Sequence, residues 1–255
     1  MQENNTVDKP TYKAKEFLLD LIFPKFCFGC QREGFYLCQD CRSLLDISEF
    51  CYCLCDFKPL QLPKEQKTGK CPRCQNKKLS GLYFALPYKE SNVTKKLIYQ
   101  FKYPPYIKNL SKTLASLIIE HLLISGKNEN SIWTPNGVPA ILVPIPLDKS
   151  KLKIRGYNQA EELAKELSVI LKIPVITDSL LKVKQTRPQM ELKKEDREKN
   201  LLDAFEIKNP ALLQDKKIFL VDDVYTTGST MEECAKVLRD VGVKSVWGIT
   251  VAREG

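Results

Sequence analysis

From residue 81 to the end of the chain, short apolar runs alternate with longer segments in which apolar residues recur at helical spacing. The apolar runs predict strands at residues 82–88, 140–145, 173–176, 179–183, 218–221 and 244–251. The helical spacing predicts helices at residues 93–103, 106–124, 157–171 and 229–241. Strands that alternate with helices are typical of a mostly parallel sheet covered on both faces. The sequence therefore predicts an α/β domain over residues 81–255.

The first 80 residues follow a different pattern. Apolar residues at helical spacing in 14–23 predict a leader helix within residues 1–24. Residues 25–80 have little regular periodicity, and all but one of the chain's cysteines lie there, between Cys27 and Cys74. We therefore expect three parts: the leader at 1–24, a cysteine-rich module at 25–80 and the α/β domain at 81–255.

The composition is that of a globular protein, and no apolar run reaches the length of a membrane helix. The first ten residues are polar and do not resemble a secretory signal, so we expect a cytoplasmic protein without a membrane segment. The formal net charge of +9 suits anionic partners. Charge alone does not establish nucleic-acid binding.

The cysteine cluster favours metal ligation over disulfides, because disulfides are rare in the cytoplasm. Three cysteine pairs have the two-residue spacing that lets two thiolates face one zinc ion: Cys27 with Cys30, Cys38 with Cys41, and Cys71 with Cys74. The first two pairs would hold one zinc ion. The third pair, with two further cysteines, would hold a second, so we expect about two zinc ions per chain.

The two further ligands must come from three alternating cysteines, Cys51, Cys53 and Cys55. Nine cysteines are one more than two tetrahedral sites need, so one of them is spare. We assign Cys51 and Cys55 as ligands, although the spacing does not separate Cys51 from Cys53. Free or disulfide-linked thiols remain an alternative for these three residues.

The most informative segment is residues 218–230. A buried strand is followed by Asp222 and Asp223, at the point where we expect it to leave the sheet. A loop of small hydroxylated residues then enters a helix: Thr226, Thr227, Gly228, Ser229 and Thr230. Amides at a helix start bind anions, and glycine lets the backbone approach a phosphate closely. Phosphate would repel the two carboxylates, so we expect them to accept hydrogen bonds from sugar hydroxyls at the carboxyl end of the strand.

A simpler interpretation of this segment is a capped helix without a ligand. Ser229 and Glu232 have the spacing of a capping box, which alone explains hydroxyl residues at a helix start. The acidic pair, the hydroxyl run and the buried strand together favour ligand binding. His121, the only histidine, lies among apolar residues in a predicted helix, so we expect it to be structural.

Basic residues after the 140–145 strand are candidates for anion contacts. Lys149, Lys151 and Arg155 could pair with pyrophosphate or with a nucleic-acid backbone, although a solvated edge explains the two lysines equally well. A second basic group at 182–199 should be mostly surface charge, with Arg197 as its best functional candidate. The aromatic residues of 99–106 could stack on bases, but core packing is the simpler expectation.

The segment 222–230 resembles the phosphoribosyl pyrophosphate (PRPP) motif of type I phosphoribosyltransferases. The chain as a whole resembles the ComF family of competence proteins, in which a cysteine-rich zinc module precedes such a domain. Further matches are Val143, Pro144, Ile145, Pro146 and Leu147, the run Arg155, Gly156, Tyr157, Asn158 and Gln159, and Gln189, Arg197, Asn200 and Phe205. The resemblance implies a type I phosphoribosyltransferase-like parallel sheet flanked by helices, with an N-terminal double zinc ribbon.

The resemblance also implies roles for individual residues. Residues 226–230 would hold the 5′-phosphate, and Asp222 and Asp223 would bind the ribose hydroxyls. Pro144, Ile145 and Pro146 would approach the pyrophosphate with its magnesium ion. Arg155 and Arg197 would complete the catalytic set, with 184–200 as a mobile loop that closes over the site. Positioning and charge stabilisation would supply the catalysis, so no nucleophilic side chain is required.

The sequence pattern and the ComF resemblance together imply three candidate functions. The first is phosphoribosyl transfer from PRPP to an acceptor that the sequence does not identify. The second is a non-catalytic PRPP sensor that serves DNA uptake in natural transformation, beside a ComFA-like helicase. The third is a zinc protein that binds single-stranded DNA, with the α/β domain as its scaffold.

Overall fold

The computed structural model describes residues 23–63, 66, 68–89, 91–126, 138–184 and 201–254. The predicted leader helix and the charged loop at 184–200, including Arg197, Gln189 and Asn200, lie outside these residues almost entirely. The chain forms two compact units, Met1–Leu45 and Asp46–Gly255. None of the helices in the described ranges combines the length and apolar character needed to cross a membrane.

The first unit is described from residue 23 and contains little regular structure. Its helix is α2, Gln39–Ser43, and an isolated bridge pairs Phe26 with Glu33. Cys38 is the N-cap residue of α2. A segment this short buries little apolar surface, so its shape depends on the cysteine cluster described below.

The second unit is built on a four-stranded sheet with the order β1-β6-β5-β2. All three pairings are parallel, as the alternating pattern predicts. The strands are β1 (Gly81–Pro87), β2 (Ala140–Pro144), β5 (Lys217–Tyr225) and β6 (Ser245–Arg253). Nearly every residue of these strands is buried, which is typical of a sheet covered on both faces.

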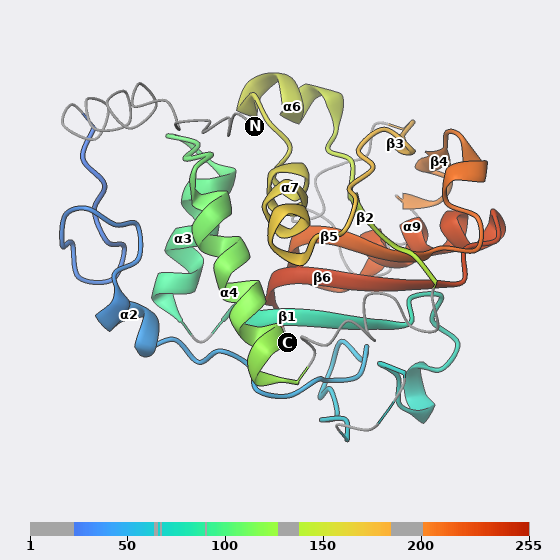
Figure 1. The fold of residues 1–255 in the computed structure, drawn as a ribbon, viewed down its shortest axis with the longest axis horizontal. Helices are drawn as coiled ribbons and strands as arrows, with labels where there is room; N and C mark the ends of the chain where they lie inside the picture. Colours follow the sequence, from blue (N-terminus) through green and yellow to red (C-terminus); the bar gives the residue numbers. More distant parts are fainter. Residues whose placement is uncertain are drawn as a thin grey trace, which may run out of the picture. The chain divides into compact units, whose positions relative to one another are not determined.

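Helices cover both faces of this sheet (Figure 1). Helices α4 (Leu110–Ile124) and α7 (Gln159–Leu171) pack together on one face, with α3 (Asn92–Lys102) beside α4. Helix α9 (Ser229–Asp240) packs on the opposite face, where Met231, Cys234 and Leu238 join the core. The same core includes Cys53, Leu54, Cys71 and Cys74, so the second group of cysteines is built into the sheet's own unit.

The structure adds elements that the pattern did not predict. Helix α6 (Lys149–Arg155) forms where we expected a basic edge, and β4 (Phe205–Ile207) pairs antiparallel with β3 (Leu180–Lys182). Two short 3-10 turns are η1 (Pro72–Cys74) and η4 (Pro210–Leu212). The strand predicted at 173–176 is wrong, since only Val175 forms an isolated bridge, to Leu142.

The three predicted parts and the two compact units divide the chain at different residues. The division after residue 45 separates the first cysteine cluster from the second, which lies in the unit that holds the sheet. The boundaries at residues 24 and 80 therefore stay predictions.

Candidate functional site

A cleft of about 630 Å³ opens at the carboxyl ends of β2 and β5. Parallel α/β sheets bind ligands at this edge, because loops and helix starts converge there. Most of the site residues expected from the sequence line it: Ile145, Pro146, Arg155, Asp222, Asp223, Thr226, Gly228, Ser229 and Thr230. Pro144 and Thr227 are not in its lining. Pro144 is the last residue of β2 and is buried.

The acidic pair lies inside β5 and not beyond its end, so the expected strand end was wrong. Asp222 pairs with Thr250 of β6, and the ladder continues to Tyr225 opposite Arg253. Parallel pairing with β6 on both sides of Asp223 thus fixes the backbone of both aspartates. Consecutive side chains of a strand point to opposite faces of the sheet. The Asp222 carboxylate accepts a hydrogen bond from the Asp223 amide at 2.8 Å.

Lys102, the last residue of α3, supplies the cation for this pair. Its Nζ lies 2.8 Å from Oδ1 of Asp223, whose side chain is only 5% exposed. Burial opposes the charge on Lys102, yet Asp223 and Asp222 together raise the pKa of Lys102. Burial and the charge of Asp223 raise the pKa of Asp222 to about 8, while Lys102 lowers it. Burial and the neighbouring carboxylate thus favour the protonated form of Asp222 at neutral pH.

The phosphate loop, residues 226–230, turns from β5 into α9 through Gly228. This residue has φ of +77°, and a Cβ atom built on it would lie 2.1 Å from the Tyr225 hydroxyl oxygen. Both observations explain a glycine here. Gly228 is the N-cap of α9 and has no side chain to cap the helix, although the Ser229 amide donates to the Thr227 hydroxyl at 3.4 Å. The Thr227 hydroxyl hydrogen-bonds to that of Ser229 at 2.9 Å, which stiffens the turn.

The capping box between Ser229 and Glu232, on which the simpler interpretation of this segment relied, does not form. Ser229 is the first helical residue, not the cap. The Glu232 carboxylate instead accepts hydrogen bonds from the backbone amides of Leu79, at 3.2 Å, and Lys78. The simpler explanation of the hydroxyl residues, capping alone, thereby loses its main support.

Residues 155–159 connect α6, α7 and the loop after β2. Gly156 ends α6 with φ of +80°. Asn158 caps α7 by accepting from the Ala160 amide, and its Nδ2 donates to the Ile145 carbonyl at 2.9 Å. Gln159 lines the cleft and is 3% exposed, and its Nε2 has no hydrogen-bond partner among the described residues. A buried donor without a partner beside a cleft fits a ligand with acceptor oxygens.

Several cleft residues were missed from the sequence or given a different role. Lys182, expected to be surface charge, has a side chain only 14% exposed and lies 3.7 Å from Asp148. Burial lowers the pKa of Lys182 despite that carboxylate. Asp148 caps α6, and hydrogen bonds from Ser150 lower the pKa of Asp148. Lys151, one of the anion-contact candidates, also lines the cleft, so its lining includes three lysines, with Lys102 and Lys182, besides Arg155. No local sequence signal distinguishes these lysines from surface ones.

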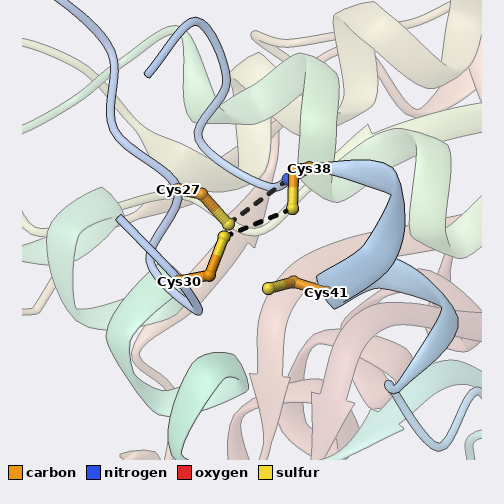
Figure 2. A group of neighbouring side chains, drawn as sticks. All are labelled: Cys27, Cys30, Cys38 and Cys41. Carbon is orange, nitrogen blue, oxygen red and sulfur yellow. Dashed lines mark hydrogen bonds between the residues drawn. The ribbon is translucent and has the colours of Figure 1, made fainter. Parts of the chain in front are cut away.

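The first cysteine cluster joins Cys27, Cys30, Cys38 and Cys41, as expected (Figure 2). The four sulfur atoms lie within 4.8 Å of one another, and those of Cys30 and Cys38 are 3.6 Å apart. Thiolates on one tetrahedral zinc ion lie about 3.8 Å apart, since each Zn–S bond is about 2.3 Å. The Cys38 amide donates to the Cys27 sulfur at 3.3 Å. A Cβ on Gly29 would lie 2.5 Å from the Cys41 sulfur, so only glycine fits there.

The second cluster joins Cys53, Cys55, Cys71 and Cys74, so the assignment of Cys51 is corrected to Cys53. The sulfur atoms of Cys55 and Cys71 are 3.6 Å apart, and those of Cys71 and Cys74 are 3.8 Å apart. A backbone amide also donates to this cluster, since the Leu60 amide donates to the Cys53 sulfur at 3.1 Å. Burial separates the two candidates, since Cys53 is fully buried in the core whereas Cys51 is only half-buried. Both clusters could hold a zinc ion.

Comparison with known proteins agrees with this arrangement. The phosphoribosyl transferase domain family matches residues 153–255. Over 120 residues the chain is 41% identical to competence protein F of Haemophilus influenzae, covering 45% of this chain and 52% of that protein. It is 26% identical over 220 residues to the DNA utilization protein YhgH of Salmonella typhimurium, covering 82% and 93%. Competence protein ComFC of Bacillus subtilis is 35% identical over 115 residues, 44% of each chain.

The chain carries a phosphoribosyltransferase domain and is a homologue of the ComF competence proteins. It spans about half the length of the first of these relatives. A solved hypoxanthine-guanine phosphoribosyltransferase of Schistosoma mansoni is 13% identical, with a TM-score of 0.27, over 58% of this chain and 66% of that one.

The phosphoribosyltransferase-like fold, with two four-cysteine clusters in its N-terminal part, confirms the predicted fold class. The ComF resemblance is likewise confirmed. Of the aromatic residues at 99–106, Phe101 is buried as expected, but Tyr99 and Tyr103 are exposed and lie 4.8 Å apart between ring centroids. His121 is buried, and its Nδ1 lies 2.6 Å from the Ser48 carbonyl oxygen, which fits a structural role.

Proposed function

We propose that this ComF homologue binds PRPP with magnesium in the cleft at the carboxyl ends of β2 and β5, and that it serves DNA uptake. The observation that carries the proposal is the pair Asp222 and Asp223 in β5, shortly before a helix start whose N-cap residue is Gly228, which has no side chain. A sugar phosphate has the matching chemistry, since its hydroxyls donate and its phosphate accepts.

At the ribose end, the two aspartates would accept hydrogen bonds from the vicinal hydroxyls. Asp223 already contacts Lys102, which holds its carboxylate in place at the edge of the cleft. Asp222 would lose its proton as the sugar hydroxyls supply donors, because hydrogen bonds to the charged form lower a carboxyl pKa. At the other end, residues 226–230 would hold the 5′-phosphate through backbone amides and hydroxyl groups.

The pyrophosphate would lie toward the loop after β2, where Ile145 and Pro146 meet the cations Lys151 and Arg155. Bound magnesium would neutralise part of the pyrophosphate charge. In a transfer reaction an acceptor forms a bond to the anomeric carbon while the bond to pyrophosphate breaks. Charge then develops on the sugar ring beside Asp222 and Asp223, so positioning and electrostatics would supply the rate.

We further propose that zinc occupies both cysteine clusters. Each cluster offers four sulfur atoms at the spacing of a tetrahedral zinc site, with amide hydrogen bonds to the sulfurs. Zinc would then supply folding free energy to a segment that lacks a large core of its own.

Calorimetric titration with Mg·PRPP tests the cleft. We expect binding to the wild-type protein and no detectable binding to Asp222→Asn/Asp223→Asn. The matched control is Asp240→Asn, at the exposed far end of the same helix α9, which should bind as wild type. Wild-type affinity in the double variant would show that the ribose contacts lie elsewhere. Release of pyrophosphate with a candidate acceptor would distinguish a transferase from a PRPP sensor.

A second candidate function, binding of single-stranded DNA, has its own observations. Tyr99 and Tyr103 form an exposed aromatic pair, and α6 presents exposed lysines beside the cleft. Exposed rings and backbone cations are the usual features of such surfaces. The relatives' names, competence and DNA utilization, agree with it. Tyr99→Ala/Tyr103→Ala should weaken oligonucleotide binding by about 1–3 kcal/mol per stacked base, and a salt-independent affinity would contradict phosphate contacts.

A further inference from the structure

A single buried arginine touches both the second cysteine cluster and the last residue of β5. Arg253 ends β6 and is 2% exposed. Its guanidinium donates to the carbonyl oxygens of Cys53, at 2.8 Å, and Cys55. The same guanidinium lies over the Tyr225 ring, 5.5 Å from the centroid. One cation therefore contacts the loop that carries two cluster cysteines and the residue that leads into the phosphate loop.

The Tyr225 side chain in turn packs directly against the phosphate loop at Gly228. The backbone of Gly228 rests so closely on the Tyr225 side chain that a Cβ atom would overlap the hydroxyl. That hydroxyl lies 3.5 Å from Nζ of Lys77, which also lies 3.1 Å from Oδ1 of Asp56. The Lys77 amide donates to the Cys74 carbonyl at 3.2 Å. The cation at the Tyr225 hydroxyl is thus held by the cluster's own chain segment.

Helix α9 is hydrogen-bonded to the same chain segment. Glu232 accepts from the amides of Lys78 and Leu79, which follow the cluster directly. Arg239 of α9 donates to the Ser80 hydroxyl at 2.7 Å. Residues that follow the second cluster therefore contact both ends of the phosphate loop, at Tyr225 of β5 and at Glu232 in the first turn of α9.

We propose that Arg253 and Lys77 are positioning residues through which a metal-loaded second cluster orders the phosphate loop. A four-thiolate zinc site fixes the loops that carry Cys53 and Cys55, and its net negative charge favours the buried guanidinium. Without the metal, those loops lose their fixed geometry and Tyr225 loses its supports. Metal binding at the cluster and ligand binding in the cleft then strengthen each other by the same factor, since such coupling is reciprocal. The ligand side of this inference rests on the proposed function.

The variant Cys30→Ser, in the first cluster, leaves the second as the complete four-cysteine site. Zinc affinity of this chain is measured at equilibrium against a chromophoric chelator, with and without saturating Mg·PRPP. We expect PRPP to raise the zinc affinity about tenfold, within the usual range of coupling, and zinc removal to lower PRPP affinity equally. An unchanged zinc affinity, with calorimetry showing that PRPP is bound, overturns the inference and leaves the proposed function standing. Failure of zinc-loaded wild-type protein to bind PRPP overturns the proposed function itself.

The residue roles are tested with Lys77→Met and Arg253→Met. Lys77→Met removes a partly exposed cation and should fold, with zinc content unchanged, PRPP affinity reduced about fivefold and the coupling factor reduced toward one. The control is Lys236→Met, which removes an ordinary ion pair with Glu233 on the surface of α9 and should preserve both affinity and coupling. A full coupling factor in Lys77→Met, and in Arg253→Met where it folds, would contradict these assignments.

Discussion

Replacing Gly228 by alanine perturbs the phosphate loop at its most constrained residue. With φ of +77°, alanine would cost about 1–2 kcal/mol of backbone strain. Its Cβ would also lie 2.1 Å from the Tyr225 hydroxyl oxygen and 2.3 Å from Cζ, so the loop or the ring must move. Overpacking of this kind costs about 1–3 kcal/mol more. We therefore expect Gly228→Ala to lower the free energy of unfolding by about 2–5 kcal/mol.

The matched control is Gly242→Ala, just past the other end of α9. Gly242 has φ of +85°, but its Cβ would meet only Gln214 at 3.6 Å, an ordinary contact, so it isolates the backbone cost of about 1–2 kcal/mol. Both variants are melted with and without Mg·PRPP. A ligand at 100 times its Kd stabilises by about 2.7 kcal/mol, and we expect that gain in Gly242→Ala but not in Gly228→Ala. An undiminished ligand-induced shift in Gly228→Ala would refute the assignment of the phosphate loop.

Three further predictions concern the acids and the cysteines. The pKa of Asp222 is raised from 3.8 to about 8. The contribution of Asp222 to stability is therefore full below about pH 4 and is lost as the pH rises through 8. PRPP affinity should rise over the same pH range, and Asp222→Asn should flatten both the stability profile and the affinity profile. Lys102→Met leaves the buried Asp223 carboxylate without its cation and should cost about 1–3 kcal/mol in denaturant unfolding, and a neutral result would contradict the pairing. Elemental analysis should find about two zinc ions per chain in Cys51→Ser but about one in Cys53→Ser, and the reverse would restore the first assignment.

The sequence predicted those parts of the fold that depend on local pattern. Apolar runs located the four parallel strands, and the two-residue cysteine spacings identified the first cluster. The acidic pair and glycine of the phosphate loop are contiguous, so the core of the cleft could be predicted as well. Helix α6 was missed because its apolar residues, Leu152 and Ile154, are both exposed and form no helical stripe.

The remaining features depend on residues far apart in the chain. Lys102 reaches Asp223 because α3 ends beside β5, which no local spacing reveals. Glu232 has the spacing of a capping box but pairs with residues more than 150 positions earlier. The choice of Cys53 over Cys51 required the packing of the cluster against the core. Tertiary contacts decide each of these cases.

The most direct test is a crystal structure of the zinc-loaded protein soaked with Mg·PRPP. The expected density shows the 5′-phosphate on the backbone amides of residues 226–230 and the ribose hydroxyls against Asp222 and Asp223. A cleft without ligand, with Asp223 still bound to Lys102 while PRPP is present in excess, would contradict the account.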